Sequence, residues 1–219
     1  ERSGNAVTNF DERLPKPQKK PVRNSVMLSQ SGAFMITRLS QNPWLDPAYM
    51  LALGNQTDLT HGDMLSYFAA LPGIETLGIY IEGFKDLDGL AFAKAVRKAV
   101  LNGKQIVVYK SGRTAPGQGG VMGHTASIAG GLTLFESVVR HAGAIVAEDF
   151  NGFDDLFYMA GVLQGKKIGG RRIGAISGAG FEAVGMADNI ESDSFALEMG
   201  ALEEATVKKV EEILVAKKL

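Results

Sequence analysis

Residues 105–131 read QIVVYKSGRTAPGQGGVMGHTASIAGG, and the rest of the chain is interpreted outward from this stretch. The apolar, β-branched residues 105–110 predict a strand, and the Gly- and Pro-rich residues after them predict a loop. We expect a helix to begin at His124, just ahead of Thr125 and Ser127. A helix N-terminus carries unpaired N–H groups and the positive end of the macrodipole, so it favours anions. Because histidine can be neutral and nucleophilic near pH 7, this placement suggests a residue that accepts and passes on a phosphoryl group.

The sequence around this stretch alternates between strands and helices. Continuous apolar runs predict strands at 25–30, 49–54, 77–82, 105–110 and 144–147. Helical spacing predicts helices at 31–41, 63–71, behind residue 82, at 124–140 and at 154–163. Apolar strands that are each followed by a helix indicate a parallel sheet covered on both faces. With right-handed crossovers, the fold class is α/β: a doubly wound parallel sheet of the flavodoxin-like kind.

The chain divides into three parts by composition. Residues 1–24 are polar, contain proline and are locally basic, so they are expected to be a linker or arm. Residues 25–165 hold the alternating pattern. Residues 166–219 form the third part, which opens with a basic, Gly-rich junction. Strands are expected at 173–176 and 195–197. One helix is expected after the turn at 177–180, ending at about Ile190, and another over 202–217. Two strands cannot close an α/β layer, so this is expected to be part of a second, similar domain.

Composition narrows the classes of partner. The 219 residues carry a formal net charge of −1, so no overall field attracts nucleic acid or an anionic membrane. The chain has no cysteine, which excludes disulfides and Cys-ligated zinc. No apolar run approaches the roughly 20 residues that span a bilayer. We expect a cytoplasmic protein without nucleic-acid or membrane partners. His61 lies at a predicted helix start and His141 at a predicted helix end, and both are expected to be solvated. Neither pairs with acids at metal-ligand spacing, so no metal site is expected.

Functional groups of such sheets collect at the carboxyl ends of the strands. Ser31-Gly32 follows the first strand, and Gly178-Ala179-Gly180 follows a strand of the second part. Both turns lack bulk, so their N–H groups can approach an anion closely. Glu82 ends the third strand. Its carboxylate could accept a hydrogen bond from one nitrogen of His124, fixing the tautomer and leaving the other nitrogen free to attack phosphorus.

Several segments together resemble the acyl-CoA synthetases (NDP-forming), the superfamily of succinyl-CoA synthetase and ADP-forming acetyl-CoA synthetase. The likeness extends over about residues 20–217, and the histidine loop is its most specific part. Two small departures are Ala126, where the family often has Gly, and Ser177, where Asn is common. The segments that carry the resemblance are SQSGA (29–33), ALGN (52–55), GIYIEG (78–83), GRTAP (112–116), GHTASIAG (123–130), ISGAGF (176–181) and MAD (186–188).

The resemblance assigns roles to individual residues. It implies that His124 is phosphorylated during turnover and that Glu82 orients it. It also implies that Ser31-Gly32 and Gly178-Ala179-Gly180 begin the two helices that hold the phosphate. The implied reaction interconverts acyl-CoA, phosphate and ADP with acid, CoA and ATP, through an acyl phosphate and then phosphohistidine.

The resemblance also implies what lies outside these residues. No cofactor is expected within this chain, whereas the full enzyme would use CoA, ADP or ATP with Mg, and phosphate. The expected partners are CoA-binding and ATP-grasp domains or subunits, with an oligomer possible. Two alternatives stay open: a regulatory or structural domain of the same fold, and a flavodoxin-like binder of a small molecule such as flavin.

Overall fold

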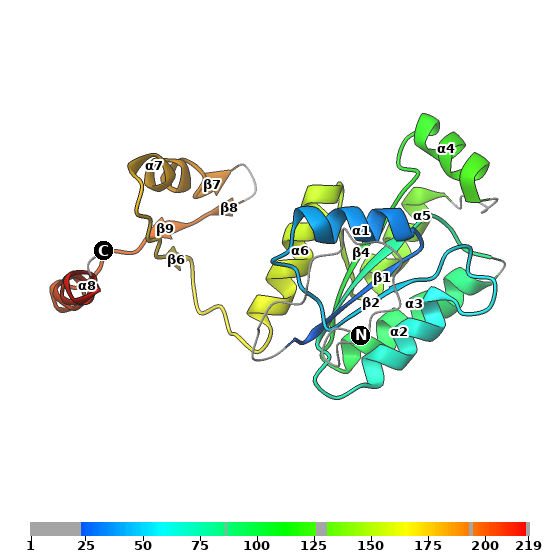
Figure 1. The fold of residues 1–219 in the computed structure, drawn as a ribbon, viewed down its shortest axis with the longest axis horizontal. Coiled ribbons are helices and arrows are strands. Elements are labelled where there is room, and N and C mark those ends of the chain that lie inside the picture. Colours follow the sequence, from blue (N-terminus) through cyan, green and yellow to red (C-terminus); the bar gives the residue numbers. More distant parts are fainter. Residues whose placement is uncertain (1–22, 86, 126–130, 193–194, 218–219) are drawn as a thin grey trace. The chain divides into compact units, whose positions relative to one another are not determined.

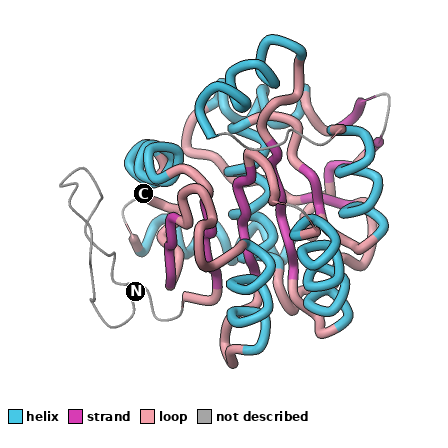
Figure 2. The backbone as a smooth tube through the Cα atoms, turned by 90° about the vertical axis from the view of Figure 1, so that its right-hand side faces the viewer, coloured by secondary structure: helices cyan, strands magenta, loops and turns pink. Residues whose placement is uncertain are grey.

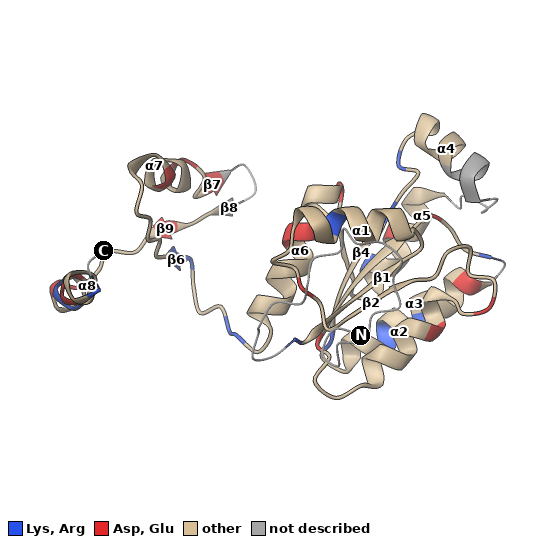
Figure 3. Cartoon of the chain, viewed as in Figure 1, with Lys and Arg blue, Asp and Glu red and all other residues tan. Residues whose placement is uncertain are grey.

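The computed structural model describes residues 23–85, 87–125, 131–192 and 195–217, and it describes the backbone alone for residues 121–125, 192 and 195. The chain forms two compact units that divide between Lys166 and Lys167. Figure 1 shows the helices and strands of both units. The segment between α6 and β6, which carries Lys166, Lys167 and Arg171, is basic and exposed (Figure 3).

The first unit is built on a five-stranded parallel sheet with the order β2-β1-β3-β4-β5 (Figure 2). This arrangement confirms the predicted doubly wound, parallel α/β fold. Strands β1 and β3 are buried along their length, and β4 is buried beyond its first residue, because helices cover both faces. The strands are β1 (Ser25–Ser29), β2 (Tyr49–Ala52), β3 (Thr76–Ile81), β4 (Gln105–Lys110) and β5 (Ile145–Val146).

The helices divide between the two faces of the sheet. One face packs on α1 and α6, and the other on α2, α3 and α5 (Figure 1). Alternate residues of one strand serve the two faces: Val108 joins the α2–α3 core and Val107 the α1–α6 core. The helices are α1 (Gly32–Gln41), α2 (His61–Ala70), α3 (Asp88–Leu101), α4 (Ala115–Thr125), α5 (Leu132–His141) and α6 (Phe150–Leu163).

Helix α6 packs very closely on β3. A Cβ atom added at Gly78 would lie only 2.7 Å from the ring of Phe157, so the glycine makes room for this ring against the strand. Phe157 is buried and stacks beside Phe153 with ring centroids 6.0 Å apart. The α1–α6 core therefore depends on aromatic rings that lie directly on the strands.

The second unit is small and open. Strand β6 (Arg172–Ile173) pairs in parallel with β9 (Glu198–Met199), and β7 (Glu191–Ser192) pairs antiparallel with β8 (Phe195–Ala196). Helices α7 (Gly180–Asp188) and α8 (Glu204–Ala216) complete it, and no described side chain of this unit is buried. Its assignment to part of a second flavodoxin-like domain stays a prediction. Among the described residues of both units, no helix has the length and apolar character needed to cross a membrane.

Candidate active site

The carboxyl ends of β1, β3 and β4 meet at one edge of the sheet. These strands are immediate neighbours, and Ser29 of β1 lies opposite Tyr80 of β3. Ser31 follows β1, and Glu82 follows β3. The structure therefore brings two of the expected site residues to adjacent strand ends, as the topology of a parallel sheet requires.

A serine turn builds the N-terminus of α1. Ser31 is the N-cap, and its hydroxyl accepts a hydrogen bond from the N–H of Phe34 at 3.2 Å. The hydroxyl of Ser29 donates to the Ser31 carbonyl at 2.6 Å and accepts from the Ser31 N–H at 3.2 Å. The N–H groups of Gly32 and Ala33 have no acceptor within the helix. Because the first turn carries no acidic residue, this helix end can attract an anion.

Glu82 is buried, with 8% of its surface exposed. Its Oε1 accepts a hydrogen bond from the hydroxyl of Tyr80 at 3.2 Å. Burial, the first cause, raises the pKa of Tyr80 to about 12, with a further contribution from Glu82 itself. The phenol therefore remains a protonated donor at neutral pH. The ring of Phe34 stacks on Tyr80 with centroids 3.9 Å apart, so α1 and the Glu82 side chain are linked through one aromatic pair.

The expectation that a helix begins at His124 is wrong. Helix α4 spans Ala115–Thr125, so His124 lies in the last turn of that helix. Thr114 starts the helix: its hydroxyl accepts from the N–H of Gly117 at 3.2 Å, and its carbonyl accepts from the N–H of Gln118 at 2.8 Å. The negative end of the dipole of α4 is therefore the end near His124. The side chain of His124 lies outside the described part of the structure, as do residues 126–130, which include Ser127.

The turn before α7 repeats the construction seen before α1. The hydroxyl of Ser177 lies 3.2 Å from the Ala179 carbonyl and accepts from the Ala179 N–H at 3.1 Å. Ala179 is the N-cap, and Gly180 is the first residue of the helix. Two differences separate the turns. Ala179 makes no side-chain cap bond of the kind that Ser31 makes, and Glu182 lies in the first turn of α7, 2.5 Å from the Ser177 hydroxyl. A carboxylate thus already occupies part of the positive helix end in the second unit.

His61 is fully buried, so the expectation that it is solvated is wrong. It is the first residue of α2, and its Nδ1 lies 2.7 Å from Oε1 of Gln56. Burial lowers the pKa of His61 to about 4. The imidazole is therefore neutral at pH 7, and Nδ1 carries the proton that it shares with Gln56. His141, in contrast, is exposed as expected.

Burial of neutral His61 has a consequence for stability. The folded pKa of about 4 lies below the ordinary 6.5, so the unfolded state binds the proton first as the pH falls. Neutral His61 therefore makes its full contribution to the free energy of unfolding above pH 6.5. This contribution, on the order of 3 kcal/mol, is lost as the pH falls from 6.5 to 4. We expect His61→Gln to flatten the dependence of the unfolding free energy on pH in this window, as measured by urea titration.

The exposed His141 supplies the matched control for this prediction. His141→Gln should keep the pH dependence of the original protein. The carboxyl of Asp63, whose pKa is lowered by hydrogen bonds from Thr60, titrates equally in all three proteins and cancels from the comparison. Equal slopes for His61→Gln and the original protein would contradict the burial of a neutral imidazole.

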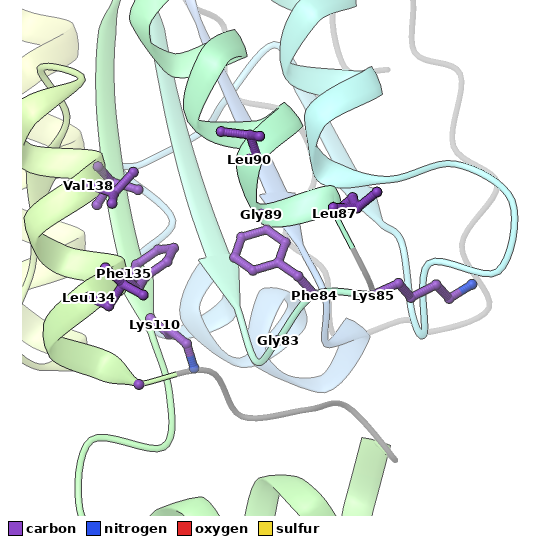
Figure 4. Close-up of a pocket in the computed structure, with 12 residues that line it drawn as sticks. Gly83, Phe84, Lys85, Leu87, Gly89, Leu90, Lys110, Leu134, Phe135 and Val138 are labelled. Carbon is purple, nitrogen blue, oxygen red and sulfur yellow. The ribbon is translucent and has the colours of Figure 1, made fainter.

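An apolar cavity of about 390 Å³ lies beside the carboxyl ends of β3 and β4, on the face of the sheet that α3 and α5 cover (Figure 4). Phe84, Leu90 and Phe135 contribute to its wall, and Lys110 lies at its end. The ammonium nitrogen of Lys110 points away from the ring of Phe135 (Figure 4). Burial lowers the pKa of Lys110. No group of three His, Asp or Glu side chains suited to a metal occurs among the described residues.

Comparison with known proteins identifies the first unit. Residues 23–163 match the family model of the succinyl-CoA ligase like flavodoxin domain. The chain belongs to this family. The match covers the whole parallel sheet together with Ser31, Glu82 and His124, so all three lie within the family domain.

Relatives of the family domain include named enzymes. The chain is 32% identical over 190 residues to acetate–CoA ligase [ADP-forming] of Methanocaldococcus jannaschii, which covers 86% of this chain and 26% of that protein. It is 29% identical to the alpha subunit of acetate–CoA ligase [ADP-forming] II of Pyrococcus furiosus, covering 87% of this chain and 40% of the subunit. The chain thus spans well under half the length of these relatives.

A solved structure also resembles the chain. It is the dinucleotide-forming acetyl-coenzyme A synthetase 1 of Ca. Korarchaeum cryptofilum in complex with phosphate and ADP. The TM-score is 0.62 with 27% identity, and the likeness covers 90% of this chain and 42% of that one. The family assignment and this likeness agree on the fold of the first unit.

Proposed function

We propose that this chain is the central phosphohistidine portion of an acyl-CoA synthetase (NDP-forming). In the full-length protein, acyl-CoA, phosphate and ADP would be interconverted with acid, CoA and ATP. The family domain over residues 23–163 supports this proposal, and so do the printed names of the relatives, which are ADP-forming ligases. The segment GHTASIAG (123–130) resembles the family's histidine loop, so His124 is the residue proposed to accept the phosphoryl group.

One observation of the structure carries the proposal furthest. The N-terminus of α1, capped by Ser31, and the buried carboxylate of Glu82 lie at the ends of neighbouring strands. An anion-attracting helix end beside a carboxylate that can accept an imidazole N–H is the pair of groups that a phosphorylated histidine needs. The presence of both groups at the same edge argues against a purely regulatory domain.

The proposed mechanism gives each group one task. Phosphate attacks the acyl carbonyl, the carbon–sulfur bond breaks, and CoA leaves as its thiolate. One nitrogen of His124 then attacks phosphorus in the acyl phosphate, and the carboxylate leaves with the electrons of the phosphorus–oxygen bond. Glu82 accepts the hydrogen bond from the other nitrogen and stabilises the positive charge that develops there. The N–H groups of Gly32 and Ala33 bind phosphate oxygens during this transfer.

The second helix end and the remaining ligands complete the proposal. Gly178-Ala179-Gly180 would bind the phosphoryl group at the start of α7. ADP would then receive this group with the help of Mg. CoA-binding and ATP-grasp domains or subunits would supply the remaining sites, and the relative in complex with phosphate and ADP is consistent with such ligands. A cytoplasmic location is part of the same proposal.

Labelling of the full-length protein tests the function. The protein is incubated with Mg and ATP labelled at the γ-phosphorus, and the label is mapped by peptide mass spectrometry. We expect one label within residues 114–140 that is lost at low pH and stable at high pH. Adding the carboxylic acid substrate together with CoA should remove it. An acid-stable label, or a label outside this range, would contradict the proposal. Bound flavin in the purified protein, detected by its absorbance, would favour the alternative binder.

A further inference from the structure

The backbone of Glu82 and Gly83 is held by side chains from three other segments. Oε1 of Gln30 accepts from the N–H of Glu82 at 2.8 Å and from the N–H of Gly83 at 3.1 Å. The ammonium of Lys110 donates to the Glu82 carbonyl at 3.2 Å, and Nε2 of Gln56 donates to the Gly83 carbonyl at 3.0 Å. All four backbone groups of this dipeptide are therefore satisfied by side chains. We name Gln30, Gln56 and Lys110 the Glu82 cradle.

Burial makes these bonds consequential. Gln30 is 5% exposed, Gln56 3% and Lys110 2%. Glu82 and Gly83 are buried as well, so these side chains provide the hydrogen bonds that their backbone groups require. A buried N–H that loses its acceptor pays the full cost of desolvation. Conformations of the dipeptide that break these bonds are therefore disfavoured. Because the three side chains follow β1, follow β2 and end β4, they grip the end of β3 from both sides.

The cradle and the carboxylate belong to opposite faces of the sheet. Tyr80 belongs to the α1–α6 core, and Glu82, two residues later, reaches its hydroxyl on that side. Leu28 belongs to the α2–α3 core, and Gln30 is two residues further on in that chain segment. The cradle therefore acts on Glu82 through its backbone. None of the four cradle bonds uses the carboxylate, which faces the Tyr80 hydroxyl.

His61 fixes the direction of one cradle member. Oε1 of Gln56 accepts from the N–H of His61 at 3.1 Å and faces Nδ1 at 2.7 Å. With its oxygen engaged in this way, Gln56 can present only its NH₂ group to the Gly83 carbonyl. The neutral, buried histidine thus supports the same dipeptide from one step further away.

We propose that Gln30 is the principal positioning residue for Glu82, because one side-chain oxygen holds two consecutive N–H groups. This rests on the proposed function, in which Glu82 orients His124. A misplaced carboxylate would slow phosphoryl transfer without weakening the binding of acyl-CoA in the rest of the enzyme. Catalytic geometry is sensitive at this level, since a shift of about 1 Å can cost 100-fold in rate.

The test compares Gln30→Met with Gln30→Glu in the full-length protein. Gln30→Met removes the acceptor at similar volume, and we expect the rate of single-turnover labelling and kcat to fall about 10- to 100-fold with KM nearly unchanged. Gln30→Glu keeps an acceptor oxygen at the same place and should recover most of the lost rate. Gln105→Met, at the exposed start of β4 on the opposite edge, should behave like the original protein.

The outcomes separate the two proposals. Label in the original protein, together with an unchanged rate in a folded Gln30→Met variant, overturns the positioning role alone. Equal loss in Gln30→Met and Gln30→Glu also overturns it, because the acceptor would then not matter. Absence of label in the original protein overturns the function itself. If Gln30→Met does not fold, Gln30→Asn withdraws the same oxygen by one methylene and gives the same comparison.

Discussion

His124→Asn in the full-length protein is expected to abolish the phosphoenzyme label and to reduce turnover at least about 1,000-fold. On the proposed mechanism the imidazole is the nucleophile, and removing a covalent nucleophile removes the two-step route rather than slowing it. Asparagine is chosen because it keeps a polar side chain of moderate size in the last turn of α4. Turnover is followed as ATP formed from acyl-CoA, phosphate and ADP.

The chain provides its own control for this prediction. His141 lies at the exposed end of α5, so His141→Asn should leave both the label and turnover unchanged. Binding of acyl-CoA should also survive in His124→Asn, since the proposed role of the residue begins after the substrate is bound. Normal turnover in His124→Asn would instead favour the regulatory or structural reading of the domain.

Phe157→Ala is expected to destabilise the first unit by about 3–5 kcal/mol. The ring is buried, lies directly over Gly78 and stacks beside Phe153. Because Gly78 has no side chain, nothing on the strand can expand into the space that the ring leaves. The cavity should therefore persist, and the cost should lie at the upper end of the range for such substitutions.

Denaturant unfolding of the 219-residue chain measures this effect. Trp44 is the one tryptophan of the sequence, and it packs edge-on against Tyr158 of α6 with centroids 4.9 Å apart. Its fluorescence thus reports on the docking of the helix that carries Phe157. Met159→Ala, at a half-exposed position of α6, should cost less than about 0.5 kcal/mol. A similar loss in both variants would contradict the close packing at Gly78.

The fold of the first unit could be predicted because its signals are local and repeated. Apolar strands that are each followed by a helix allow few arrangements other than a covered parallel sheet. The same topology predicted that Ser31 and Glu82 would share one edge. That placement needs only the strand order and the positions just after two strands.

Two features could not be read in this way. The glycines of α4, among them Gly119 and Gly120, have poor helix propensity, so the segment was expected to be a loop. The available signal was Thr114 followed by Pro116, an N-cap with a proline in the first turn. The burial of His61 depends on Gln56, which reaches it from a loop. Gln56 is only five residues from His61, but no local pattern shows that this loop folds back over the start of α2.

The direction of α4 bears on how long a phosphorylated protein would persist. On the proposed role of His124, the phosphoryl group would be attached near the last carbonyl groups of this helix, where a dianion is disfavoured by roughly 0.3–1 kcal/mol. The phosphohistidine would then be slightly destabilised, and it would transfer its phosphoryl group more readily. This polarity would slightly raise the group-transfer potential of the phosphohistidine and so favour passing the group on to the helix N-termini of α1 and α7.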